Sequence, residues 1–334
     1  MPSRSLYLVF VLSIAFALLF FLNLLIGESF IYPSDFFNNL FSESQTNLII
    51  VNFRLPKALT AILAGIALSV SGLLMQTLFR NPIAGPYVLG ISSGASLGVS
   101  VVIMGAGLTG FAFVGNLSIL VGALVGSIAM MLILLSILRF VKDIMTLLII
   151  GVMFGAFASS LSSILQYFSP SFQVKAFVLW TFGNLSTVNY SQLWIMMLLI
   201  AFALALVVYS LKGLNILLLG NDNLSNFGIN KKQLQLLILI STAILTGVVT
   251  AFCGPIGFVG IVVPHFSRIL IKTSNHIKLL PVTALLGASL MLLSDILTQL
   301  PQNGIILPIN SVTAFIGIPF ILWFLLKPSR KIKI

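Results

Sequence analysis

Apolar runs of about 20 residues recur from one end of this chain to the other, and they constrain its fold more than any other feature. A helix of roughly 20 apolar residues crosses the hydrocarbon core of a bilayer, which is about 30 Å thick. Inside lipid every backbone N–H and C=O needs a partner within the protein, so each run is predicted to be a helix. We count ten spans, at about 6–26, 55–79, 88–106, 112–139, 145–168, 190–211, 233–253, 257–271, 279–300 and 308–327. The expected fold is all-α, a polytopic membrane bundle that forms a single transmembrane domain over residues 1–334.

The composition excludes an ordinary soluble domain. Of the 334 residues 59% are hydrophobic and only 7% are charged, whereas soluble domains carry roughly 25% charged residues. The formal net charge of +11 raises the alternative of nucleic-acid binding. The basic residues, however, come singly or in pairs between apolar runs and build no basic face. We therefore expect a lipid bilayer and no nucleic acid around this chain.

The Lys and Arg residues predict the orientation, because loops on the cytoplasmic side of membrane proteins carry an excess of them. With the N-terminus in the cytoplasm, 14 of the 17 basic residues lie inside and 3 lie outside. The internal residues are Arg4, Arg80, Arg139, Lys142, Lys212, Lys231, Lys232, Arg268, Lys272, Lys278, Lys327, Arg330, Lys331 and Lys333, and the external ones are Arg54, Lys57 and Lys175. The bias predicts that both termini are cytoplasmic, and it supports an even number of spans more firmly than the number ten.

Small residues within several spans predict close helix packing. Gly65, Ser69 and Gly72 lie in one apolar run, and small side chains let membrane helices approach one another closely. Compact Gly/Pro turns at 80–86 and 254–257 lie on opposite sides of the membrane. Their placement weakly suggests two inverted halves, as in many transporters, although no sequence repeat is detectable.

Two connections are long enough to have a role of their own. The external one, about 27–54, is expected to contain one short helix. In the internal one, about 212–232, a polar cluster can cap a short helix over 221–228 that shows Leu224 and Phe227 on one side. This helix either lies on the base of the bundle or offers its surface to a partner. Spacing alone slightly favours the first alternative.

Few side chains suggest chemistry. The sequence contains no phosphate loop, zinc-protease motif or Cys/His metal cluster, so we expect no catalytic residue, no metal site and no cofactor in this chain. His265 and His276 are interpreted as local structural residues, and Cys253 as a small core residue. Asp295 lies within a span near its outer end, where an ionisable group is a functional candidate. It is either a cation or proton site or, as we favour, a carboxylate bonded to its polar neighbours. Those neighbours are Ser294, Thr298 and Gln299.

Arg54 and Lys57 stand three residues apart around Pro56 and are expected to share one helix face at the outer mouth of a span. Most loop cations only mark the membrane interface. These two are unusual because the outer side holds only three cations, and because cations at a helix N-terminus oppose the helix dipole. An acidic partner that docks at this mouth would explain that small cost.

Several motifs, in order and in register from about residue 50 to 327, resemble those of one known family. They are FRLPKAL at 53–59, SGLLMQ at 71–76, NPIA at 81–84, LGISSGA at 89–95, GFVGIVVPH at 257–265, and LPI, TA and GIPF at 307–309, 313–314 and 317–320. By these motifs the chain is identified as a member of the FecCD family, the permeases of iron-siderophore, haem and cobalamin importers.

The resemblance implies a type II ABC importer permease with ten spans, in the cytoplasmic (inner) membrane of a bacterium. Its expected partners are a second permease subunit, identical or similar, and two cytoplasmic ABC ATPases that bind ATP and Mg and supply the power. An extracellular or periplasmic substrate-binding protein would deliver the cargo. The chain itself would be a transport subunit and not an enzyme, with the translocation path between the two permease subunits.

The resemblance also implies roles for individual residues. Arg54 and Lys57 match external arginines that pair with glutamates of the binding protein. The turn Asn81-Pro82-Ile83 matches the cytoplasmic gate. The internal connection matches the coupling helices that enter an ATPase cleft, which reverses the preference for a helix lying on the base of the bundle. The candidate coupling residues are Gly220, Asn221, Asp222, Leu224, Phe227 and Gly228.

Some positions depart from the family pattern. Lys57 replaces an arginine and loses the fork that holds a carboxylate at two points. Gln299 stands where arginine is common, and Ile306 stands where an acidic residue is common. These departures weaken the expected docking contacts and fit a heterodimer in which a similar subunit supplies the missing ones.

Two other functions are alternatives to an importer permease, namely a secondary transporter and a membrane enzyme. An ion-coupled secondary transporter is favoured by the polytopic form and by Asp295, but it does not explain a helix exposed on the inner side. A membrane enzyme has no clustered catalytic groups in this sequence. Within the importer class an iron siderophore is the commonest cargo, followed by haem and cobalamin, and no residue of the chain selects among them.

Overall fold

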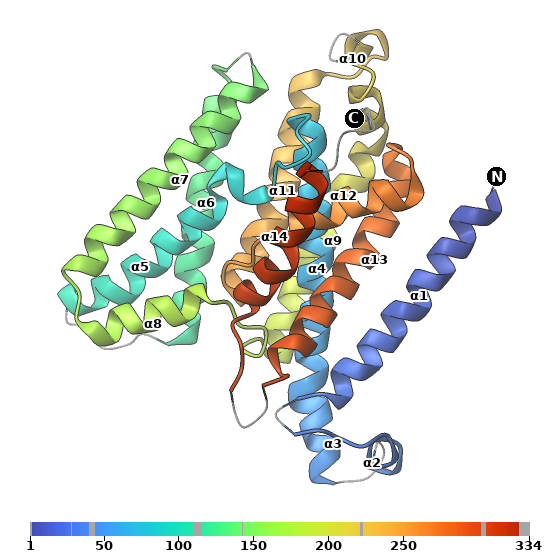
Figure 1. Ribbon diagram of the computed structural model, residues 1–334. Helices are drawn as coiled ribbons and strands as arrows, with labels where there is room; N and C mark the ends of the chain where they lie inside the picture. Colours follow the sequence, from blue (N-terminus) through green and yellow to red (C-terminus); the bar gives the residue numbers. More distant parts are fainter. Residues whose placement is uncertain are drawn as a thin grey trace.

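A computed structural model describes residues 2–27, 29–39, 44–109, 115–141, 143–220, 223–301 and 305–326. Within these ranges all regular secondary structure is helical (Figure 1). The helices are α1 Pro2–Leu25, α2 Pro33–Asn39, α3 Gln45–Ile49, a π-helical turn Ile50–Arg54, α4 Leu55–Leu78, a 3-10 turn Pro86–Leu89, α5 Ile91–Thr109, α6 Asn116–Leu138, α7 Ile144–Tyr167, α8 Ser171–Thr181, α9 Tyr190–Leu217, α10 Asn223–Asn226, α11 Lys231–Cys253, α12 Val259–Ile271, α13 His276–Thr298 and α14 Ile309–Leu326.

Each of the ten predicted spans coincides with one of the longer helices. Among the described residues, seven helical stretches are long and apolar enough to cross a membrane, namely 7–25, 45–78, 116–138, 144–167, 190–217, 231–253 and 276–298. The apolar stretches 91–105, 259–271 and 309–324, which lie in α5, α12 and α14, are shorter. The all-α, multi-pass fold is thus confirmed, while the count of ten crossings stays a prediction.

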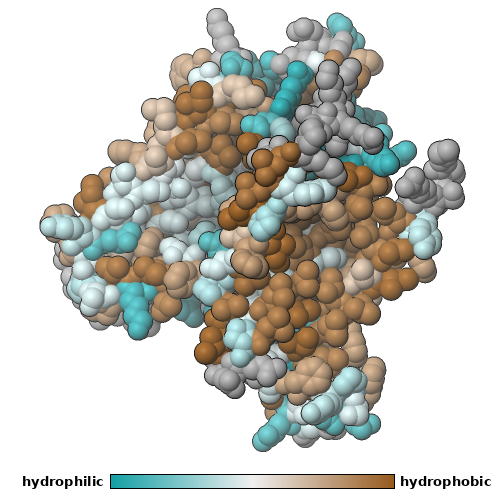
Figure 2. All heavy atoms as spheres, viewed as in Figure 1, coloured by the Kyte–Doolittle hydropathy of each residue, from teal (hydrophilic) through white to brown (hydrophobic). Residues whose placement is uncertain are grey.

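Helix α4 is the centre of the bundle. It packs against α9, α11, α12 and α13, and α5, α6 and α7 form a group at one side (Figure 1). Most α4 side chains are small or apolar on every face, which is typical of a helix surrounded by other helices. On the face drawn in Figure 2, apolar surface covers the central and right-hand part of the molecule at mid-height, the left-hand part is paler, and hydrophilic residues lie toward the upper and lower ends. This is the pattern expected of a protein whose middle lies in lipid.

The small residues of α4 allow backbones to touch, as the sequence predicted. A Cβ atom added to Gly72 would lie 1.7 Å from the Gly260 carbonyl oxygen of α12. One added to Gly65 would lie 2.2 Å from the Gly287 carbonyl oxygen of α13. Neither overlap is tolerable, so glycine at these two positions fixes how closely α12 and α13 approach α4.

The external connection is shorter than predicted, because the helix expected to begin at residue 55 begins at Gln45. Ser44 caps its start by accepting a hydrogen bond from the Asn47 N–H at 3.2 Å. Pro56 has no N–H and would interrupt a regular α-helix. The chain instead forms a π-helical turn, in which the Leu55 N–H bonds to the Ile50 carbonyl, and continues into α4. The short helix expected in this connection is α2, whereas the external helix α8 was not predicted.

Candidate functional site at the outer mouth

A cavity of about 470 Å³ opens at the end of the bundle that carries α2, α3 and α8, called here the outer end because the loop charges predict that orientation. Its lining includes Asn23, Arg54, Lys57, Asp295, Gln299 and Ile306. These side chains come from α1, the π-helical turn, α4, α13 and the segment before α14. The fold therefore brings together five positions that the sequence had singled out separately, and it adds Asn23, which sequence reasoning missed.

Arg54 points into the bundle rather than out of it. Its side chain is only 8% exposed, and Nη1 donates to the carbonyl oxygens of Leu24 at 2.7 Å and Leu25 at 2.6 Å. Nη2 donates to the Ser29 carbonyl oxygen. The last carbonyls of a helix lack partners within it, and the negative end of the helix dipole favours a cation. Arg54 thus caps the C-terminal end of α1.

This geometry corrects the sequence interpretation of Arg54. The residue was expected to project from a helix N-terminus, at a small cost that a docked acidic partner would explain. It lies well inside a continuous helical stretch that starts at Gln45, and the α1 carbonyls surround its guanidinium. Docking of a partner on Arg54 stays a prediction, but the burial of its guanidinium does not require such a partner.

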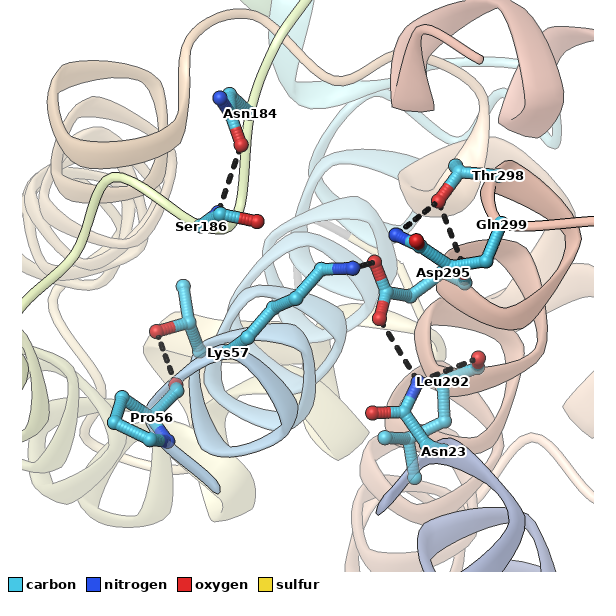
Figure 3. A network of polar contacts seen from close by, with 10 residues as sticks. Asn23, Pro56, Lys57, Asn184, Ser186, Leu292, Asp295, Thr298 and Gln299 are labelled. Atoms are coloured by element: carbon cyan, nitrogen blue, oxygen red, sulfur yellow. Dashed lines mark hydrogen bonds and ion pairs between the residues drawn. The ribbon is translucent and has the colours of Figure 1, made fainter. Parts of the chain in front are cut away.

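Lys57 and Asp295 form an ion pair across the cavity, with Lys57 Nζ 2.9 Å from Asp295 Oδ1 (Figure 3). The other carboxylate oxygen accepts from Asn23 Nδ2, also at 2.9 Å. Asn23 Nδ2 lies 3.4 Å from the Leu292 carbonyl oxygen as well. One carboxylate therefore joins α1, α4 and α13.

The expected partners of Asp295 were wrong. Its sequence neighbours Thr298 and Gln299 bond elsewhere: the Thr298 hydroxyl donates to the Asp295 backbone carbonyl at 2.6 Å, and Gln299 Nε2 lies 3.4 Å from the Thr298 hydroxyl (Figure 3). The carboxylate itself is held from α1 and α4. Since Lys57 already neutralises it, the geometry favours a structural ion pair over a cation site.

The electrostatics of the cavity follow from these contacts. Two cations and one carboxylate line it, and the carboxylate is engaged by Lys57. One positive charge is left over, on Arg54, next to oxygens that carry only partial charge. A cavity of this kind suits an acidic group of a partner better than a cationic ligand.

At the opposite, inner end the candidate gate is a tight turn. Arg80 has a positive φ of 48°, and the Asn81 N–H bonds back to the Gln76 carbonyl at 3.2 Å. Asn81 Oδ1 accepts from the Ile83 N–H at 3.1 Å. Pro82 and Ile83 share a small apolar cleft with side chains of α12 and α14. The turn is as compact as predicted, and its role as a gate stays a prediction.

The candidate coupling segment differs from its prediction. The helix is only the four residues of α10, and Gly220 and Gly228 on either side have positive φ values of 127° and 70°. Leu224 is 1% exposed and belongs to the core, whereas Phe227 is 62% exposed. The expectation that both face a partner is therefore wrong for Leu224. Asn221 and Asp222 lie outside the described residues.

Comparison with known proteins agrees with this architecture. The model of the FecCD transport family matches residues 15–327. The vitamin B12 import system permease protein BtuC of Citrobacter koseri is 36% identical over 321 residues, which cover 96% of this chain and 94% of that protein. The Salmonella typhi protein of the same name is 36% identical over 324 residues, with the same coverage.

Solved structures show the same fold. A transporter assigned to the metal-chelate type of ABC transporter, in an inward-facing conformation, superposes with a TM-score of 0.83. It is 29% identical in sequence, and the match covers 96% of this chain and 99% of that one. PsaBC from Streptococcus pneumoniae, solved with a Fab, matches with a TM-score of 0.56 at 16% identity, which bears on the fold alone.

Proposed function

The chain belongs to the FecCD transport family and is a permease of the type II ABC importer class, and on that premise we propose that it carries a metal chelate inward through a path at a permease dimer interface. The match over residues 15–327 carries this proposal, because it covers the second part of α1 and every helix from α2 to α14 rather than one motif. The ion-coupled alternative loses its main support, since Asp295 is paired with Lys57.

The cargo is proposed at two levels. All candidate cargoes of this family are large metal complexes, and the inward-facing structural relative is of the metal-chelate type. Among chelates, the sequence predicted an iron siderophore, whereas the curated relatives at 36% identity are vitamin B12 permeases and favour cobalamin. Cobalamin is therefore the first cargo to test, and a ferric siderophore is the second.

The partners follow from the same proposal. A second permease subunit would complete the path, two cytoplasmic ATPases would bind ATP and Mg, and a binding protein would deliver the chelate at the outer mouth. The exposed Phe227 beside α10 supports an ATPase contact at the inner end. The cavity that holds Arg54 and Lys57 supports an acidic contact at the outer end.

Uptake by proteoliposomes tests the proposal. The permease is reconstituted with its ATPase and binding protein, and labelled cyanocobalamin and a labelled ferric siderophore are offered in separate experiments. We expect uptake of one chelate that needs ATP, stops with vanadate and persists with a proton ionophore. Uptake that ignores vanadate and collapses with the ionophore would instead establish an ion-coupled carrier.

A further inference from the structure

A row of polar side chains, all buried except the half-buried Asn215, crosses the inner end of the bundle. Asn215 Oδ1 of α9 lies 2.9 Å from His276 Nδ1 of α13 and accepts from the His276 backbone N–H at 2.7 Å. His276 Nε2 lies 2.8 Å from the Thr77 hydroxyl of α4. Arg268 of α12 reaches Thr77 at 3.5 Å and donates to Gln76 Oε1. Four helices are thus joined by side-chain hydrogen bonds alone.

The row contains a buried cation. Arg268 is 5% exposed, and its recorded partners in the described part of the chain are the neutral side chains of Gln76 and Thr77. A buried charge without a counter-charge is costly, and ionisable groups kept inside membrane proteins are functional candidates. Gln76 is fixed from its other end, because its Nε2 donates to the Ile261 carbonyl of α12 at 3.0 Å.

Both ends of the row touch segments with a proposed role in transport. Asn215 stands two residues before the end of α9, where the connection to α10 begins. At the other end, the Gln76 backbone carbonyl accepts from the Asn81 N–H of the candidate gate. A second tie runs in parallel, since Arg80 Nη2 donates to the Leu217 carbonyl oxygen at 3.0 Å. The last turn of α9 is therefore fixed to the end of α4 at two points.

We infer that Asn215, His276 and Thr77 form a link through which displacement of the connection around α10 moves the turn 80–84, with His276 as its positioning residue. The inference rests on the proposed function, because it needs an ATPase that moves this connection. Direct hydrogen bonds between rigid helix ends transmit a displacement, whereas an apolar contact at the same place would slide. The turn is too short to absorb the motion, since Asn81 is bonded to α4 and Ile83 is bonded to Asn81.

The variants distinguish hydrogen bonds that transmit a movement from hydrogen bonds that only hold the helices together. Thr77→Val keeps the shape of the side chain and removes the hydroxyl, and Thr77→Ser restores it. His276→Asn keeps a polar atom near the place of Nδ1, facing Asn215, and loses the one facing Thr77. The matched control is Ser267→Ala on α12, because within the described part of the chain the buried Ser267 hydroxyl bonds only to the Val263 carbonyl of its own helix, at 2.8 Å.

The first measurement is chelate transported per ATP hydrolysed by the reconstituted complex, alongside the melting temperature of each permease. Thr77→Val and His276→Asn should each lower this ratio at least about threefold, a size expected along a coupling network. The double variant should do no worse than either single one, since both break the same link. Thr77→Ser and Ser267→Ala should keep the ratio. An unchanged ratio in Thr77→Val, or a loss matched by Ser267→Ala, overturns the inference.

The second measurement follows the turn itself. A cysteine replaces the exposed Ile83, and its labelling is compared without nucleotide and after vanadate trapping; the native Cys253 is buried and stays silent. The labelling should change between the two states in the parent protein, and this change should be clearly smaller once Thr77→Val is added, with the tie from Arg80 to Leu217 still in place. A change of the same size in Thr77→Val overturns the link. If the unmodified complex lacks ATP-driven uptake, it is the proposed function that fails.

Discussion

The guanidinium of Arg54 closes the C-terminal end of α1, and this contact sets the cost of its removal. Three backbone carbonyls face it, and one hydrogen bond to a charged group contributes about 1.5–3 kcal/mol. Arg54→Met should therefore destabilise the permease by more than about 2 kcal/mol, measured as a fall in the thermal unfolding midpoint in detergent. Lys175→Met, the change of an exposed cation on α8, is the control and should leave the midpoint unchanged. Equal midpoints for the two variants would contradict the capping role.

The ion pair between Lys57 and Asp295 leads to a prediction about docking. Asp295→Asn keeps the shape of the side chain and frees the positive charge of Lys57 toward the cavity. If an acidic binding protein docks here, its association should become about two- to fivefold faster at low salt, and the gain should vanish when salt screens the charges. Stopped-flow association at several salt concentrations measures this effect.

The control for that experiment is Asp143→Asn, which makes the same change of charge at the start of α7, at the inner end. It should leave the association rate unchanged. Slower association in Asp295→Asn would mean that the partner reads the carboxylate itself and not the cations.

At the scale of single residues, the sequence predicted which side chains matter better than it predicted their contacts. Arg54, Lys57 and Asp295 stood out because charges are scarce in this chain. Their partners depend on how α1 and α13 are positioned in the folded bundle, and a local sequence pattern does not contain that information. Asp295 was assigned to its neighbours in sequence, and Lys57 reached it instead from a helix more than two hundred positions earlier in the chain.

At the scale of elements, Leu224 and Phe227 at α10 differ in burial, although the sequence predicted that both lie on one exposed side of the helix. Leu224 belongs to the core beside α9, and Phe227 is exposed. Phe227→Asp should leave the permease folded and abolish uptake while the ATPase continues to hydrolyse ATP. Leu224→Asp should reduce the yield of folded permease, because it buries a charge without a partner. Uptake, ATP hydrolysis and melting temperature, measured together, separate the two effects.

A second exposed aromatic residue serves as the control for Phe227→Asp, because it shows what a new negative charge does elsewhere on the surface. Tyr209 of α9 is an exposed aromatic residue away from α10, and Tyr209→Asp should disturb ATP coupling less than Phe227→Asp. Normal uptake in Phe227→Asp would show that this side chain takes no part in the ATPase contact.

The longer helices were predictable because each of them must bury or satisfy about 20 residues of backbone in lipid, a requirement visible in composition alone. The short elements obey local rules that compete with one another. The helix expected to start at residue 55 starts ten residues earlier, at Gln45, where Ser44 caps it, and a π-helical turn accommodates Pro56. α8 was missed because it carries no apolar run long enough to be noticed.

At the scale of the whole molecule, the first and last described helices are open to comparison. Helix α1 starts, and helix α14 stops, toward the end of the bundle that carries α10, while α2, α3 and α8 lie at the other end (Figure 1). This arrangement agrees with the even number of crossings that the loop charges predict, and that number stays a prediction. Which end meets the cytoplasm depends on how the chain inserts into a charged membrane.

Thiol labelling in intact cells decides the orientation, and this chain suits the method because its one cysteine, Cys253, is buried. Gln45→Cys places an exposed thiol at the start of α3, and Ser274→Cys places a half-exposed thiol in the loop between α12 and α13 at the opposite end. A reagent that cannot cross the membrane should label position 45 and miss position 274, and permeabilised cells should label both. The parent protein is the control and should stay unlabelled. Labelling of position 274 alone would mean that the orientation is the reverse of the predicted one. The cavity with Arg54 and Lys57 would then face the cytoplasm, where no delivered chelate arrives.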